Sequence, residues 1–362
     1  MTFDYPGRVG RLQSAMGEAG VDVTLLSIGA DLPYFTGYEA SPSERLTVLV
    51  VPATGQPVMF VPQLEAPRVQ PGEFDLRSWS ELDDPVSLAA GVVPAPRRAA
   101  VGDHMWSVFL TRFQKEWTAT SWLPASELTG GLRIRKDADE VELLRRAAHG
   151  VDRIMGRMAS AVAFAGRAEH DVARELAELT VAEGHDEPAF TIVASGPNGA
   201  SPHHHPGDRI VDEGDLIVCD FGGRIGGYFS DSTRTFVVGE PTVAQQEVHD
   251  VVAAANEAGR ASVAPGVECQ HIDRITRAVV EGAGYGEYFV HRTGHGIGLE
   301  VHEHPYIVEG NETVLEPGMT FSVEPGIYLP GRFGVRIEDI VACTQHGIES
   351  LNASSRELVR VG

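Results

Sequence analysis

The sequence has few lysines and few cysteines. Of its 362 residues only Lys115 and Lys136 are lysines, and 51 acidic against 29 basic residues give a net charge of −22. Nucleic acids and anionic membranes are bound by clustered Lys and Arg, so we expect neither as a partner. The three cysteines, Cys219, Cys269 and Cys343, are odd in number and lack a C-x-x-C spacing. This disfavours a disulfide framework and predicts small buried side chains in a reducing, cytoplasmic compartment.

Long apolar runs are also missing. No stretch approaches the ~20 apolar residues that span a bilayer. The first residues, Met-Thr-Phe-Asp-Tyr-Pro, contain no basic region followed by an apolar core, so we expect no signal peptide. The remaining composition, 43% hydrophobic and 22% charged, is that of a globular protein. A chain of this length is sufficient for two domains, each with its own core.

The first part of the chain, residues 1–132, is predicted to be an α/β domain. Helical periodicity and apolar β-rich segments predict a helix at 7–19 and strands at 21–28, 46–51 and 57–61. This part has no cluster of metal-binding residues. We place the domain boundary before residue 133, because Asp137-Ala-Asp-Glu begins a new helix with acidic residues in its first turn.

The second part, residues 133–362, alternates pairs of helices with hairpins. The predicted elements are helices at 138–163 and 168–183, a strand at 189–194, a hairpin at 216–237, helices at 242–263 and 269–282, and a hairpin at 319–343. This order predicts two similar halves that face each other.

Each predicted hairpin carries two acidic residues. In the first, a turn at 224–227 would place Asp220 and Asp231 directly opposite each other. In the second, Glu324 and Glu338 are symmetric about Gly331. Directly opposed like charges destabilise a sheet, and a buried carboxylate costs several kcal/mol unless it is paired or bound to a metal. The two pairs therefore require cations, and with one imidazole they suit two divalent ions.

The imidazole is expected from His295, which lies in Thr-Gly-His-Gly-Ile-Gly (293–298). The flanking glycines allow close approach of the backbone while the ring points into a site. A phosphate loop is the rival interpretation, but the Lys-Ser/Thr of a Walker motif is absent. The segment around His302 begins like a zinc-protease H-E-x-x-H motif, yet Tyr306 occupies the place of the second histidine. We therefore expect His302 to donate a hydrogen bond to substrate.

Three further features concern the surroundings of the acids. Arg336 lies two residues before Glu338, on the same strand face, and is expected to orient a ligand carboxylate, whereas Asp339 faces the other way. The histidine run 203–205 is expected to contain one functional member at most. Arg332, in the second hairpin loop, could bind a terminal carboxylate, although an exposed loop arginine is the simpler interpretation.

These motifs resemble a known family, the pita-bread metallopeptidases, in particular Xaa-Pro dipeptidases (prolidases) and aminopeptidase P. The resemblance covers the whole chain and rests on Val-Cys-Asp220-Phe-Gly, Ser-Asp231-Ser-Thr-Arg, Thr-Gly-His295-Gly-Ile-Gly-Leu-Glu-Val-His302-Glu, Val-Glu324-Pro-Gly-Ile-Tyr and Gly-Val-Arg336-Ile-Glu338-Asp. It implies an α/β creatinase-type N-terminal domain and an α+β pita-bread catalytic domain with a curved antiparallel sheet.

The resemblance also implies a site with two divalent ions, for which we expect Mn, with Co or Zn as alternatives. The implied metal ligands are Asp220, Asp231, His295, Glu324 and Glu338. Asp231 would chelate one ion, His295 would bind the other, and the remaining three would serve both. Glu324 is implied as a proton shuttle with His203 and His302 as catalytic hydrogen-bond donors; His291 and Arg336 are expected to bind substrate.

The implied substrate is a dipeptide or short peptide with proline at the second position. The proline nitrogen carries no N–H and the ring fixes φ, so general peptidases handle this bond poorly. Aminopeptidase P, acting on longer peptides, and a catalytically inactive binding or scaffold relative are the alternatives. Creatinase lacks this ligand set, and methionine aminopeptidase typically lacks the N-terminal domain. We also expect a homodimer.

Overall fold

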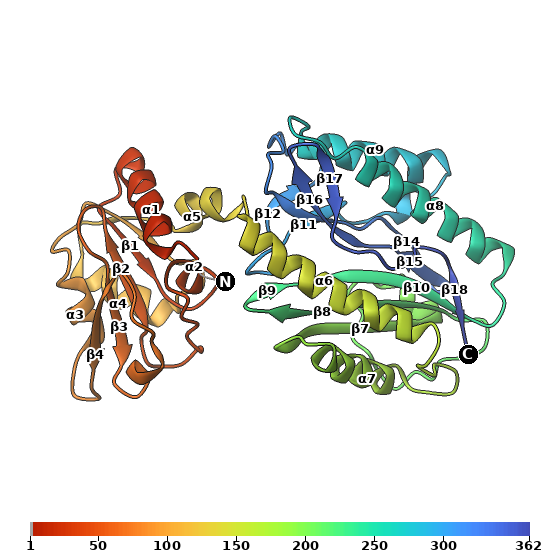
Figure 1. Cartoon of the computed structure of the whole chain (residues 1–362), viewed down its shortest axis with the longest axis horizontal. Coiled ribbons are helices and arrows are strands. Elements are labelled where there is room, and N and C mark those ends of the chain that lie inside the picture. The colour runs from red at the N-terminus through yellow and green to blue at the C-terminus, as the bar shows by residue number, and fades with distance from the viewer. Residues whose placement is uncertain (1–2) are drawn as a thin grey trace. The chain divides into compact units, whose positions relative to one another are not determined.

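The computed structural model describes residues 3–362 and divides them into two compact units, between Arg133 and Ile134. Figure 1 shows that each unit is built around its own sheets. In the part of the chain that is described, no helix has the length and apolar character that crossing a membrane requires.

The first unit is an α/β unit, as predicted. Its elements are α1 (Tyr5–Ala19), β1 (Val23–Leu26), α2 (Asp31–Thr36), β2 (Val48–Pro52), β3 (Val58–Pro62), η1 (Ala66–Arg68), β4 (Asp75–Trp79), α3 (Pro85–Ala90), β5 (Arg98–Val101), α4 (Ser107–Glu116), β6 (Ser121–Pro124) and α5 (Ser126–Arg133). Six strands form one mixed sheet in the order β4-β3-β2-β1-β5-β6. The helix and the three strands predicted from sequence periodicity are all present.

The second unit has the predicted order of helices and hairpins. Its elements are α6 (Ala138–Met158), α7 (Glu169–Ala182), β7 (Glu187–Ser195), η2 (Gly196–Ala200), β8 (Leu216–Ile225), β9 (Tyr228–Phe229), β10 (Ser232–Val238), α8 (Val243–Ala261), α9 (Cys269–Gly282), η3 (Gly286–Tyr288), β11 (Gly294–Gly296), β12 (Glu303–Ile307), β13 (Thr320–Val323), β14 (Gly326–Leu329), β15 (Phe333–Arg336), β16 (Asp339–Thr344), β17 (Gly347–Ser350) and β18 (Val359–Val361). The capping box of Asp137 and Glu140 fixes where α6 begins.

Two helix pairs cover the sheets of this unit (Figure 1). Apolar residues of α6 and α7 pack with β7, β8 and β10 in one core. Residues of α8 and α9 pack against β13 to β16 in two further cores. The strands run β18-β10-β8-β7 in one sheet and β12-β11-β13-β16-β17 in the other, and only β10–β18 is a parallel pair among these described strands. Two helix-covered halves therefore meet along mainly antiparallel strands.

The three cysteines are buried and unpaired, as predicted. Cys219 packs among apolar residues of the first core, while Cys269 and Cys343 lie in a core formed with α9 and β13. Burial raises the pKa of all three thiols. They therefore behave as small apolar side chains rather than as nucleophiles.

Candidate metal centre

The first acid pair shares one face of a hairpin, but its register differs from the prediction. Gly226 and Gly227 both have positive φ, 58° and 87°, and make a two-residue turn. Asp220 consequently pairs with Thr233 rather than with Asp231. The predicted opposition is wrong by two residues, because the turn lies at the two glycines rather than midway between the acids. Since side chains alternate with a period of two, this shift keeps both aspartates on the same face.

The second acid pair has the predicted register. The ladder pairs on either side of it are Gly326 with Arg336 and Val323 with Asp339. Glu324 and Glu338 therefore occupy opposed positions where the chain passes from one sheet to the next. Pro325, which cannot donate to a ladder, separates β13 from β14 at this point. Asp339 points to the other face, where Arg234 and Arg356 donate to its carboxylate.

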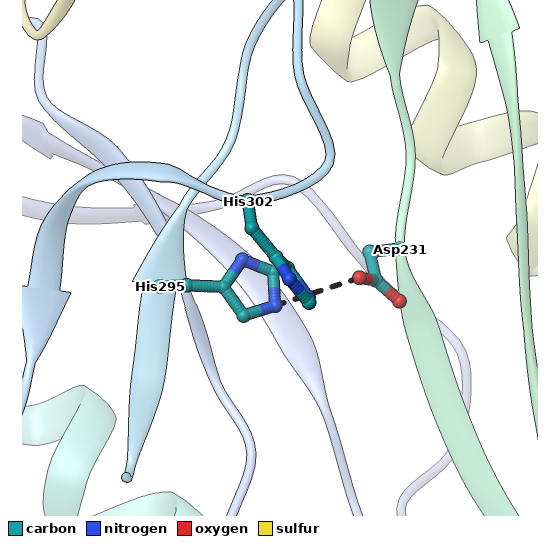
Figure 2. Close-up of side chains that lie close together, drawn as sticks. All are labelled: Asp231, His295 and His302. Atoms are coloured by element: carbon teal, nitrogen blue, oxygen red, sulfur yellow. Dashed lines mark ion pairs between the residues drawn. The ribbon is translucent and has the colours of Figure 1, made fainter. Parts of the chain in front are cut away.

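The acidic and imidazole side chains of both halves meet at one place. In each of three overlapping groups, the candidate ligand atoms lie within 4.8 Å of one another. The groups are Asp220, Asp231 and Glu338; His295, Glu324 and Glu338; and Asp231, His295 and His302. All five residues predicted as ligands lie in these groups, and His302, which was expected to contact substrate, lies in the third. Figure 2 shows His295 and His302 pointing toward Asp231.

Several carboxylate oxygens in this cluster are buried without a hydrogen-bond donor among the described residues. They are Asp220 Oδ1, Asp231 Oδ1 and Glu338 Oε1. Burial and neighbouring carboxylates raise the pKa of Asp231 and of Glu338 well above the usual range. Burial, opposed by Arg336 and reinforced by Asp220, raises the pKa of Glu324 to about 7. Unpaired hard oxygen donors that repel one another fit divalent cations.

His295 is presented to these acids by the backbone around it. A Cβ added to Gly294 would lie 1.9 Å from the Ser322 carbonyl oxygen, and one on Gly296 would lie 2.3 Å from a carbonyl of β12. Only glycine fits at either position, as predicted from the alternating pattern. Nδ1 bonds the Gly296 carbonyl at 3.1 Å, which leaves Nε2 3.4 Å from Glu324 Oε1. Burial lowers the pKa of His295 to about 3, so the ring is neutral and its Nε2 lone pair can bind a metal ion.

Arg336 is buried behind the first acid pair. It donates from Nη2 to Asp220 Oδ2 at 2.5 Å and from Nε to Thr233 Oγ1 at 3.0 Å. Its Nη1 donates to the hydroxyl of Tyr328 and to the carbonyl of Pro202. The guanidinium therefore has the geometry to hold Asp220 in place, the orienting function inferred from its position on the strand.

The histidine run separates into two sets. His203 and His205 are exposed and line a cavity above the cluster. His204 also lines this cavity, but it is half-buried and its Nε2 lies 2.7 Å from the buried carboxylate of Glu169. His291 also lines the cavity; its ring nitrogens bond the Arg292 carbonyl and the Tyr328 hydroxyl, and burial lowers its pKa to about 4.

The cavity has a volume of about 680 Å³, ample for a short peptide. Besides the residues already named, its lining includes Phe190, Thr191, Ile192, Pro202, Pro206, Arg292 and Val301. The guanidinium of Arg292 lies 4.3 Å from the ring centroid of Tyr306. The sequence interpretation did not include these residues. Arg292 could have been suspected from its place beside His291, whereas β7 shows no spacing that links it to the acids.

Arg332 lies elsewhere. It is exposed in the turn between β14 and β15, 5.3 Å from the ring of Phe333. Among the described residues that line the cavity, Arg332 is not included. The simpler interpretation, an exposed loop arginine, is confirmed.

Comparison with known proteins agrees with this geometry. Residues 142–345 match metallopeptidase family M24, and residues 8–135 match the Creatinase/Prolidase N-terminal domain. A probable dipeptidase PepE of Mycobacterium tuberculosis is 44% identical over 99% of this chain and 96% of its own length. The chain belongs to the M24 metallopeptidase family.

Solved structures of M24 proteins have the same fold. A prolidase from Thermococcus sibiricus is 35% identical with a TM-score of 0.95, and the match covers 100% of both chains. An X-Pro aminopeptidase from Thermotoga maritima is 30% identical with a TM-score of 0.86, covering 98% of this chain and 99% of that chain. The expected fold class is thereby confirmed: a creatinase-type α/β domain followed by an α+β pita-bread catalytic domain.

Proposed function

We propose that this M24 metallopeptidase is an Xaa-Pro dipeptidase, which hydrolyses the bond before proline in dipeptides at a site with two metal ions. The observation that carries the proposal is the convergence of four carboxylates and one imidazole on the floor of a peptide-sized cavity. The likeness to prolidases along the whole chain supports it.

We assign the ions to five ligands, namely Asp220, Asp231, His295, Glu324 and Glu338. The three buried carboxylate oxygens without a hydrogen-bond donor support this assignment, since each needs a cation or a hydrogen-bond donor. Mn²⁺ is the proposed metal, with Co²⁺ or Zn²⁺ as alternatives for the same donors. Two bound ions would lower the pKa of the attacking water and polarise the scissile carbonyl.

The chain's own residues supply the proton transfers. Glu324 lines the cavity, and burial, opposed by Arg336 and reinforced by Asp220, raises its pKa to about 7. We propose that it takes the proton of the attacking water and returns it to the leaving proline nitrogen. His203 and His302, both exposed in the cavity, would donate hydrogen bonds to the substrate and to the developing oxyanion.

We propose supporting functions for His291 and Arg336 in substrate binding. Both line the cavity, but their polar atoms already bond protein groups. Arg336 would act by holding Asp220, and His291 by fixing the shape of the wall beside Tyr328. Arg292 is the cation in the cavity that we assign to the free carboxylate of a dipeptide.

Aminopeptidase P activity is the second candidate, supported by the likeness to the Thermotoga X-Pro aminopeptidase. The two activities are separated by comparing Xaa-Pro dipeptides with Xaa-Pro-Yaa-Zaa peptides in the presence of Mn²⁺. Preference for the dipeptide agrees with the proposal, whereas equal or better cleavage of tetrapeptides favours the aminopeptidase. An inactive binding relative would cleave neither, but the complete ligand set argues against it.

We further propose that the domains comprise residues 1–132 and 133–362, that the protein forms a homodimer, and that it acts in the cytoplasm. The three unpaired buried cysteines support a reducing compartment. The N-terminal domain is further proposed to limit substrate length.

A further inference from the structure

One wall of the cavity is a loop with little regular structure. The histidine loop, defined here as residues 196–207, follows β7 and begins with the short η2 turn. Its residues Pro202, His203, His204, His205 and Pro206 line the cavity. The loop therefore carries a proposed catalytic histidine without the support of a sheet or a long helix, so something else must hold it.

One support is the buried carboxylate of Glu169. Glu169, in the first turn of α7, is fully buried and accepts hydrogen bonds from both ends of the loop. Its Oε1 accepts from the amide and hydroxyl of Ser195, each at 2.7 Å. Its Oε2 accepts from His204 Nε2 at 2.7 Å and from the Gly207 amide at 3.3 Å. Asn198 Nδ2 lies 3.1 and 3.2 Å from the two oxygens.

The carboxylate is held as an anion at this position. Burial raises the pKa of Glu169, but hydrogen bonds from Ser195, His204 and Asn198 outweigh burial and leave the pKa below its usual range. The amide groups in the first turn of α7 also favour a negative charge there. Each donor is a group of the loop or of its first flanking residue, so the anion gathers the loop into one conformation.

The opposite side of the loop is packed against a strand pair. A Cβ on Gly199 would lie 3.1 Å from the amide nitrogen of Gly334, and one on Gly334 would lie 1.9 Å from the Gly199 carbonyl oxygen. Arg336 donates to the carbonyl of Pro202. The loop thus lies between Glu169 and β15. The Nε2 of His204 bonds Glu169, whereas His203 and His205 are exposed in the cavity.

We propose that Glu169 is a positioning residue for catalysis, which holds His203 in the cavity through the hydrogen bonds it accepts from the histidine loop. This inference rests on the proposed peptidase function. Glu169 itself does not touch the cavity lining's reacting groups; it acts through His204 and the loop backbone. Loss of its charge frees the loop, and His203 then occupies its productive position only part of the time.

The first test is Glu169→Gln. Both carboxylate oxygens accept from N–H or O–H donors, so either orientation of the amide places its NH₂ against donors. We expect kcat/KM on an Xaa-Pro dipeptide to fall by about 10- to 100-fold, with the loss mainly in kcat and with metal content unchanged. Glu169→Asp, which keeps the charge, should recover part of the activity.

The decisive measurement is a double-mutant cycle with His203→Ala. If Glu169 acts through His203, adding Glu169→Gln to His203→Ala should lower kcat/KM by less than about threefold further. Equal losses in both backgrounds, or loss of metal in Glu169→Gln alone, would overturn the proposal. If Glu169→Gln does not fold, His204→Ala takes its place in the cycle, with a smaller loss and the same dependence on His203.

The matched control is Asp152→Asn. Asp152 on α6 likewise gathers a loop, accepting from the amides of Ala353 and Ser354 at 2.6 and 3.1 Å, but it does not line the cavity. We expect a lower melting temperature with kcat/KM within about twofold of wild type. A loss of kcat/KM as large as that of Glu169→Gln would show that general loosening explains both, which contradicts the proposal.

Hydrogen exchange separates this proposal from the proposed function. Peptides that cover 196–207 should exchange faster in Glu169→Gln than in wild type, while peptides from β16 and β17 remain unchanged. This holds even if wild-type protein hydrolyses no Xaa-Pro peptide, an outcome that would reject the function alone. Unchanged exchange in the loop would reject Glu169 as its anchor.

Discussion

At the scale of single residues, the site is dominated by charges that the protein does not neutralise itself. Arg336 pairs with Asp220, whereas Asp231, Glu324 and Glu338 have close ion-pair contacts with His295, whose pKa is lowered. Buried anions arranged in this way destabilise the fold unless cations join them. The residue-level predictions below follow from that arrangement.

Glu324→Gln should reduce turnover far more than it reduces stability. The amide is nearly isosteric but cannot carry a proton and is a weaker ligand. Loss of a general acid–base typically costs about 10²–10⁴ in rate. Steady-state kinetics of the metal-replete variant provide the measurement, with the melting temperature as a control for folding. Turnover close to wild type would remove Glu324 from the mechanism.

His302→Ala tests which of two functions this histidine has. We expect kcat/KM to fall while the metal content remains that of wild type, because His302 is assigned to the substrate. The centroid of its ring lies 4.1 Å from that of His295, and its ring is close to Asp231. A function as metal ligand is therefore the alternative. Loss of one ion per chain, measured by metal analysis, would make His302 a ligand.

Arg292→Ala should raise KM for an Xaa-Pro dipeptide. A hydrogen bond to a charged group contributes about 1.5–3 kcal/mol, which corresponds to roughly 10- to 100-fold in affinity. Arg332→Ala is the matched control, since Arg332 is exposed outside the cavity lining, and should leave KM unchanged. If the two substitutions change KM equally, Arg292 does not bind the substrate carboxylate.

At the scale of elements, two hairpins, the segment around β11 and the histidine loop form the site. In the first hairpin the two acids are diagonal neighbours, and in the second hairpin they lie directly opposite each other. The histidine loop forms one wall of the cavity, and Glu169 accepts hydrogen bonds that hold its conformation. Because the anchor is a carboxylate, the stability of this element should depend on pH.

The pKa of Glu169 is lower in the folded protein than its usual value of 4.5. Above pH 4.5 the ionised group therefore stabilises the fold, and this contribution is lost as the pH falls through the lower folded pKa. We expect the stability difference between wild type and Glu169→Gln to be largest at neutral pH and to shrink below pH 4.5. Urea unfolding at several pH values measures it; a difference that grows on acidification would contradict the sign.

Many of the helices and strands that form the site could be predicted from the sequence. Period and capping signals located the helices of the catalytic unit, and the symmetry about Gly331 predicted the register of the second hairpin. The first register was missed because the turn was placed midway between the two acids, whereas it lies at Gly226 and Gly227. Glu169 resembled an ordinary acidic residue at a helix start, and no local pattern links it to a loop 26 or more residues away.

At the scale of the whole molecule, the N-terminal domain has no assigned chemistry. The proposal that it limits substrate length and takes part in a homodimer predicts two properties of the full-length protein. Light scattering should give the mass of two chains, and Xaa-Pro should be cleaved more readily than Xaa-Pro tetrapeptides. A strict monomer that cleaves tetrapeptides equally well would remove this proposal and place aminopeptidase P first.

The central claim is a site for two metal ions, and anomalous diffraction from crystals grown with saturating Mn²⁺ tests it most directly. We predict two peaks per chain, one beside Asp231 and the other beside His295, with Asp220, Glu324 and Glu338 reaching both. A single fully occupied peak, with the second position empty at saturating Mn²⁺, would contradict the account.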